Sequence, residues 1–87
     1  MKKEELKARK KFLFDVKEVN LDELLRAKLE LESVQYMLKN WRGLKLDGGT
    51  IIRLLEFESK RKKSIEDLKV ELSMILLQIY EVDRDLQ

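Results

Sequence analysis

The side chains of this chain that could do chemistry are carboxylates, hydroxyls and amines, because histidine and cysteine are absent. Those two residue types include the commonest general base, the thiol nucleophile and the usual zinc ligands. The serines therefore have no base to activate them, and the pairs Glu56 with Glu58 and Glu66 with Asp67 are typical of solvated helix surfaces. We expect a protein that is not an enzyme and that binds no metal or cofactor.

One cluster of amines is notable, a basic block made of Lys60, Arg61, Lys62 and Lys63. Together with the first eleven residues, which hold six basic and two acidic side chains, it makes salt-dependent contacts with phosphates physically possible. The block lies inside an apolar repeat, however, and not beyond the end of a zipper, and the total charge is only +2. We therefore interpret it first as a charged outer surface, with nucleic-acid contact by these four residues as the alternative.

Two amphipathic repeats must position these charges. Apolar residues recur every three or four positions in residues 24–41 and 51–86, except at Glu58 and Arg61. This is the pattern of one helix face, and no proline interrupts either repeat. Gly43, Gly48 and Gly49 separate the two repeats. Gly43 is placed to end the first helix in a left-handed conformation, and Thr50 to cap the second. The sequence predicts an all-α fold, an antiparallel helical hairpin of long, coiled-coil-like helices.

We expect a single helical domain over residues 1–87, with helices at 2–19, 21–42 and 50–86 and a turn at 43–49. The N-terminal third leaves two possibilities. Residues 2–19 either form a third helix, with a bend or break at Val19 and Asn20 where Asn20 starts the next helix as a cap, or they continue that helix through one extra four-residue step in its apolar face. We expect the break, and leave open whether the segment folds back.

A hairpin that closes near residue 46 places residue i opposite residue 92 minus i. The basic first eleven residues then lie opposite Glu81, Asp83 and Asp85, and the basic block lies opposite Glu30 and Glu32. Exposed ion pairs of this kind contribute about 0 to 1 kcal/mol each. Charge is therefore predicted to set the direction of pairing more than its stability.

The half of the hairpin away from the turn is more apolar than one partner helix can bury. Apolar side chains cover most of the helix circumference in residues 68–82, and residues 12–25 across from them are similarly rich. Because a contiguous apolar patch favours association, we predict a homo-oligomer assembled as a helical bundle, with a dimer ahead of a monomeric three-helix bundle or a different protein partner. The predicted oligomer interface consists of Phe12, Leu13, Phe14, Val16, Leu21, Leu24, Leu25, Leu68, Leu72, Ile75, Leu76, Ile79, Tyr80 and Val82.

Neither a membrane nor export is indicated. The longest apolar run, residues 74–77, is far shorter than the roughly 20 residues of a membrane span. The charged first residues are not followed by the apolar segment of a signal peptide. We expect a cytoplasmic protein that does not bind membranes.

Residues 51–87 resemble the long second helix of small phage-encoded transcriptional regulators of the RinA and ArpU kind. The shared features are an I-I-x-L-L-E start at residues 51–56, an I-x-x-L-K-x-E-L pattern at residues 65–72 and an aspartate-containing end. In that family a helical hairpin with a polar, glycine-containing connector precedes a helix-turn-helix, and no DNA-contacting residue can be carried over to residues 1–87.

The resemblance implies the oligomerisation or partner-binding half of such a regulator. It suggests a non-enzymatic helical interaction module of phage or mobile-element origin, which binds a protein partner through a self-associating bundle. The alternative is a small nucleic-acid-associated transcriptional regulator that uses the basic block.

Overall fold

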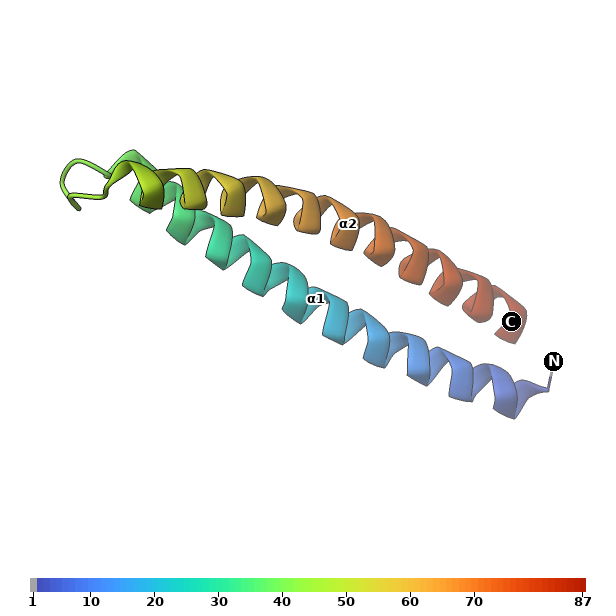
Figure 1. Cartoon of the computed structure of the whole chain (residues 1–87). Coiled ribbons are helices and arrows are strands. Elements are labelled where there is room, and N and C mark those ends of the chain that lie inside the picture. Colours follow the sequence, from blue (N-terminus) through green and yellow to red (C-terminus); the bar gives the residue numbers. More distant parts are fainter. Residues whose placement is uncertain (1) are drawn as a thin grey trace.

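The computed structural model describes residues 2–87 and contains two helices, α1 over Lys3–Lys39 and α2 over Gly48–Leu86. The helices run antiparallel along each other, and residues 40–47 join them at one end of a rod with extents of 62 × 15 × 14 Å (Figure 1). The predicted all-α hairpin is confirmed. Met1, where the expected domain begins, lies outside the described residues.

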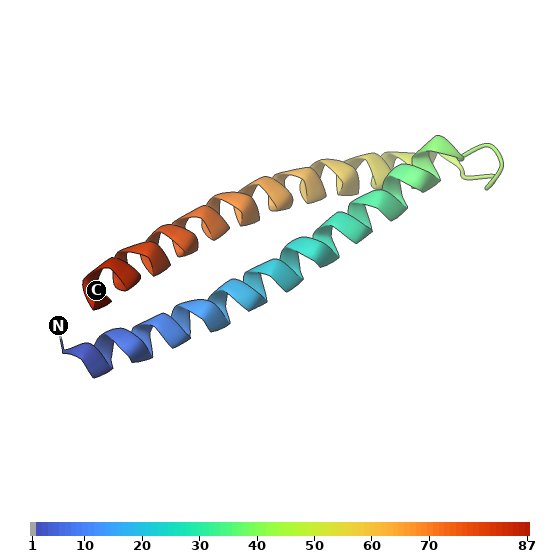
Figure 2. The same cartoon turned by 180° about the vertical axis from the view of Figure 1, so that it is seen from behind.

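Helix α1 continues without interruption through Val19 and Asn20, and its ribbon is unbroken along its whole length (Figure 2). The predicted break, and with it the separate helices at 2–19 and 21–42, is not found in the described part of the chain. The spacing of buried residues explains why. Leu13, Asn20 and Leu24 are all buried, so the face turned toward α2 passes through Asn20 with one extra four-residue step. Asn20 is an interior residue and not a helix cap.

The first helix ends earlier than predicted and without the help of Gly43. Helix α1 stops at Lys39, and the side-chain Nδ2 of Asn40 donates a hydrogen bond to the carbonyl of Tyr36 at 2.8 Å. The left-handed backbone conformation falls on Lys45, whose φ is 55°, while Gly43 has no positive φ. Gly43 was expected to adopt a left-handed conformation, and it does not adopt one.

The second helix begins two residues before the predicted start, because Asp47 caps it in place of Thr50. The Oδ1 of Asp47 accepts a hydrogen bond from the backbone N–H of Thr50 at 2.7 Å. This hydrogen bond lowers the pKa of the Asp47 carboxyl. A short carboxylate at this position satisfies a free amide and faces the positive end of the helix dipole.

The core is a single seam between the two helices, and it has two clusters of buried side chains. The cluster toward the open end contains Leu6, Leu13, Ile75, Ile79 and Val82, with Val16 and Leu86 packed against it. The cluster in the middle contains Leu24, Ala27 and Ile65, with Leu31, Leu68 and Leu72 packed against it. The buried apolar side chains keep 4 to 7 % of their surface exposed, because two helices cannot enclose a side chain on all sides.

Candidate interaction surfaces

The structure divides the predicted oligomer interface into side chains that are buried within the hairpin and side chains that are exposed. Five of them are buried in the seam, namely Leu13, Leu24, Ile75, Ile79 and Val82. Three are half-buried beside it, namely Val16, Leu68 and Leu72. Six are exposed, namely Phe12, Phe14, Leu21, Leu25, Leu76 and Tyr80. Only these six are available to another molecule while the hairpin is closed.

Four further exposed side chains lie among these six and were not part of the predicted interface. They are Val19, Val70, Met74 and Leu77, each 58 to 61 % exposed. With them, ten of the sixteen exposed large apolar side chains fall in residues 12–25 and 70–80. The exposed apolar surface is thus concentrated in the half of the rod away from the connector, and the all-round apolar character of residues 68–82 was the signal for it.

One side of the hairpin is marked by an ion pair between Lys10 Nζ and Asp83 Oδ1, which lie 2.5 Å apart. Steps of three, four or seven residues return to the same side of a helix. From this pair such steps lead to Lys7, Phe14, Lys17, Leu21 and Lys28 on α1, and to Tyr80, Leu76, Lys69 and Lys62 on α2. The amines of Lys10 and Lys17 lie 5.9 and 4.5 Å from the centroid of the Phe14 ring. We call this surface the lysine side.

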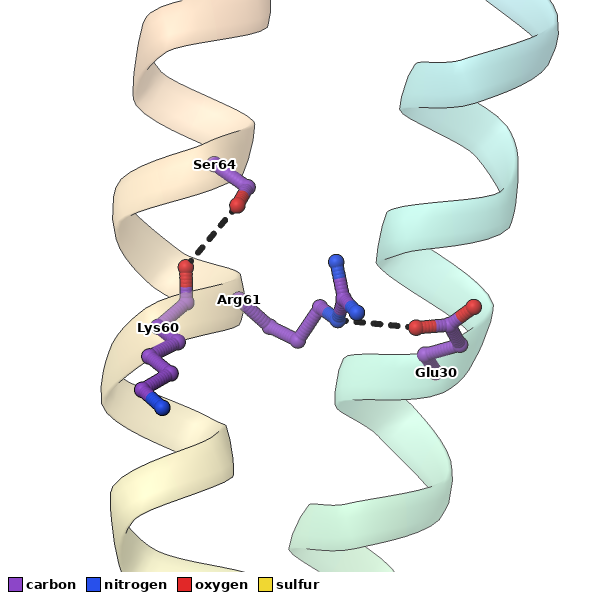
Figure 3. A network of polar contacts seen from close by, with 4 residues as sticks. All are labelled: Glu30, Lys60, Arg61 and Ser64. Carbon is purple, nitrogen blue, oxygen red and sulfur yellow. Dashed lines mark hydrogen bonds and ion pairs between the residues drawn. The ribbon is translucent and has the colours of Figure 1, made fainter.

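The opposite side is marked by a second ion pair. Arg61 Nε lies 2.8 Å from Glu30 Oε2, but its N–H does not point at that oxygen, so the contact is an ion pair without a directed hydrogen bond (Figure 3). Twenty residues separate Glu30 from Lys10, which turns the side-chain direction by about 200°. Glu30 and Lys10 therefore leave α1 on opposite sides.

Shallow grooves follow this second side. One of about 470 Å³ is lined by Glu23, Arg61 and Asp67 among others, and one of about 250 Å³ near the open end is lined by Glu81 and Asp85 among others. Helical spacing adds further carboxylates to the same surface. We call it the acidic side, and its carboxylates are Glu5, Glu23, Glu30, Asp67, Glu71, Glu81 and Asp85.

The basic block does not form one surface on a single hairpin. Successive residues of a helix point about 100° apart, so its four side chains are spread around α2. Arg61 reaches toward Glu30, with its guanidinium carbon 4.7 Å from the centroid of the Phe57 ring, while Lys60 points away from that pair (Figure 3). Lys62 belongs to the lysine side. A continuous basic surface from these residues would need a second copy of the chain.

One buried polar side chain interrupts the seam. Asn20 is 3 % exposed, and its Nδ2 donates to the Leu68 carbonyl at 3.2 Å and to Glu71 Oε2 at 3.5 Å. Its Oδ1 is buried and has no hydrogen-bond partner. An interior asparagine favours the pairing in which its amide meets acceptors on the neighbouring helix, at a cost in stability.

Within residues 2–87, no three carboxylates come close enough together to hold a metal ion. Neither described helix has a segment long and apolar enough to cross a membrane. Comparison of the chain with protein-family models, with curated proteins and with solved structures found no match. The likeness to phage regulators therefore stays a prediction from the sequence.

Proposed function

We propose that this protein is a non-enzymatic interaction module, a helical hairpin that self-associates and binds a protein partner through its exposed apolar side chains. The observation that carries the proposal is the concentration of those side chains in one half of the rod, where Phe12 and Tyr80 are each 64 % exposed. Contiguous apolar surface on a soluble protein marks sites of association. An origin in a phage or mobile element is supported by the sequence resemblance alone.

The size of the exposed surface supports the same proposal. The accessible surface is 6917 Å², whereas a compact monomer of 10.4 kDa is expected to expose roughly 5,400 Å². The excess of about 1,500 Å² on one chain is nearly twice the roughly 800 Å² that each partner contributes to a standard protein interface. A two-helix seam is also a small core for a chain of this length, so association would supply contacts that the hairpin lacks.

Sedimentation equilibrium at low and high micromolar concentration tests the proposal. We expect the wild-type chain to associate, and Leu76→Asp to raise the concentration of half-association at least about tenfold, because it places a charge in the apolar surface. Lys63→Gln changes the net charge by the same amount at an exposed position on the outer surface of α2 and should leave association unchanged. A wild-type chain that stays monomeric at high micromolar concentration would refute the proposal.

The alternative, a small nucleic-acid-associated regulator, has less support because Arg61 of the basic block is engaged by Glu30. A salt titration with duplex DNA distinguishes the two functions. DNA binding at low salt that is lost when Lys60, Lys62 and Lys63 are replaced by alanine would favour the alternative. Absence of binding at low salt would remove it.

A further inference from the structure

Charge is divided between the two sides of the hairpin, and neither side balances its own charge. The lysine side carries Lys3, Lys7, Lys10, Lys17, Lys28, Lys39, Lys62 and Lys69 against Glu18, Glu32, Glu66 and Asp83. Two of those carboxylates are already engaged, since Asp83 pairs with Lys10 and Glu66 lies 3.7 Å from Lys69. The acidic side carries seven carboxylates against Arg9, Arg26, Arg53, Lys60 and Arg61. Each side therefore has an excess of one sign of charge.

The pairing of the two helices does not compensate for this excess. The ion pairs Lys10 with Asp83 and Glu30 with Arg61 show which residues lie across from one another. By the same spacing, Lys62 falls across from residues 29–31, within one helical turn of Lys28. On the other side, Asp85 falls across from residues 6–8, within one turn of Glu5. Like charges that face each other repel. The opposite charges that each side lacks are present on the other side of the same molecule.

We infer that the lysine side of one copy docks on the acidic side of a second copy. The inference rests on the proposed self-association and specifies its geometry. Apolar side chains accompany the charges on both surfaces. Exposed on the lysine side are Phe14, Leu21, Leu76 and Tyr80, and exposed on the acidic side are Phe12, Val19 and Met74. A side of the rod, 62 by 15 Å, presents about 900 Å², close to the roughly 800 Å² that each partner contributes to a standard interface.

This contact joins two different surfaces, so it is not closed by a two-fold axis. The two surfaces lie on opposite sides of a thin rod, and a second copy therefore leaves one of each uncovered for the next. A symmetric dimer through the lysine side would instead place lysines against lysines, which costs binding energy. We expect a stack of hairpins that lengthens with protein concentration and dissociates as salt screens the charges.

Two charge-reversal variants test this geometry. The first carries Lys17→Glu, Lys28→Glu and Lys69→Glu on the lysine side, and the second carries Glu23→Lys, Asp67→Lys and Glu81→Lys on the acidic side. In each variant alone, both sides of the hairpin then carry net charge of the same sign, so two copies repel each other. The concentration of half-association should therefore rise at least about tenfold. An equimolar mixture should associate again, because each variant supplies the surface that the other has lost.

A matched control carries Lys11→Glu, Lys63→Glu and Arg84→Glu, which change the net charge as much as the first variant does. These three exposed residues lie on the outer surfaces of the helices, away from both sides. The control should associate like the wild type, and circular dichroism should show intact helices in every variant. Sedimentation velocity of each protein and of the mixture is the measurement.

The outcomes separate this inference from the proposed function. Undiminished association of either reversal variant alone, a mixture that stays monomeric, or a wild-type dimer that does not grow would overturn the docking geometry and leave self-association standing. A wild-type monomer at high micromolar concentration would overturn both.

Discussion

At the scale of single residues, Asn20 lowers the stability of the hairpin but defines how α1 pairs with α2. Its amide nitrogen has acceptors on α2, but its Oδ1 is buried without a partner. A buried, unsatisfied polar group costs about 1–3 kcal/mol. Because the observed register also brings the Asn20 amide within 3.5 Å of the Glu71 side-chain Oε2, we interpret Asn20 as the residue that penalises shifted pairings.

Replacement of Asn20 by leucine should therefore raise the free energy of unfolding by about 1–2 kcal/mol, measured by urea denaturation followed by circular dichroism. Asn20→Asp places a charged side chain of similar size at the same buried position and should lower the free energy of unfolding. A less stable Asn20→Leu variant would show that the hydrogen bonds to α2 outweigh the unsatisfied oxygen.

The cap at Asp47 should make stability depend on pH. The Thr50 amide lowers the pKa of the folded carboxyl below its unfolded value, so the stabilisation is complete above the unfolded pKa of about 4 and is lost as the pH falls through the folded pKa. Asp47→Ala should lower the Tm at pH 7, and the difference from wild type should shrink below about pH 4.

Asp47→Asn is the control, because it keeps a side-chain acceptor at the cap but cannot titrate. Its Tm relative to Asp47→Ala should be independent of pH, as measured by thermal melts from neutral to strongly acidic pH. A constant difference between wild type and Asp47→Ala over that range would contradict the assigned role of the carboxylate.

At the scale of an element, neighbouring residues of α2 differ in burial, because one packs against α1 and the next faces outward. Ile75 is 6 % exposed in the seam, whereas Leu76 is 48 % exposed. Ile75→Ala should cost about 2–5 kcal/mol of unfolding free energy, while Leu76→Ala should change the monomer by less than about 0.5 kcal/mol. Urea denaturation at low protein concentration, where the chain is monomeric, measures both changes in unfolding free energy. Equal losses at the two positions would mean that the pairing face of α2 is assigned wrongly.

The periodicity of apolar residues predicted the two helices and their antiparallel pairing, because spacing of three and four residues reports one buried face. It also predicted correctly that the basic N-terminal residues lie opposite acidic residues of α2, and that Arg61 lies opposite Glu30. The continuity of α1 was missed. Asn20 followed by Glu23 has the local pattern of a helix start, whereas the burial of Asn20 depends on Leu68 and Glu71, 48 and 51 residues further along the chain.

The predicted interface identified the apolar region of the hairpin but not which of its side chains are exposed, for a similar reason. Composition shows that residues 68–82 are apolar around the helix, but it does not show which part of the circumference α1 covers. Ile79 and Tyr80 were assigned together, and the structure buries the first and exposes the second. The separation of lysines from carboxylates onto two sides becomes visible only after the seam is known, because position on a helix is defined relative to the buried face.

At the scale of the whole molecule, a thin rod with a two-helix seam should depend on association for part of its stability. Because binding of further copies to the folded state stabilises it by mass action, the Tm should rise over a roughly hundredfold increase in protein concentration. The same series for Leu76→Asp should be flatter. A Tm that is independent of concentration for the wild type would indicate that the hairpin is stable by itself.

The two helix ends that lie together at the tip opposite the connector (Figure 1) also decide how the molecule responds to tension. A load applied at residues 3 and 86 peels the helices apart one turn after another, so only a few contacts bear it at any moment. The cluster around Leu6 and Val82 then yields before the cluster around Leu24 and Ile65. A neighbour docked along the side of the rod would contact both helices across the seam between them. The same tension would then have to break many contacts at once.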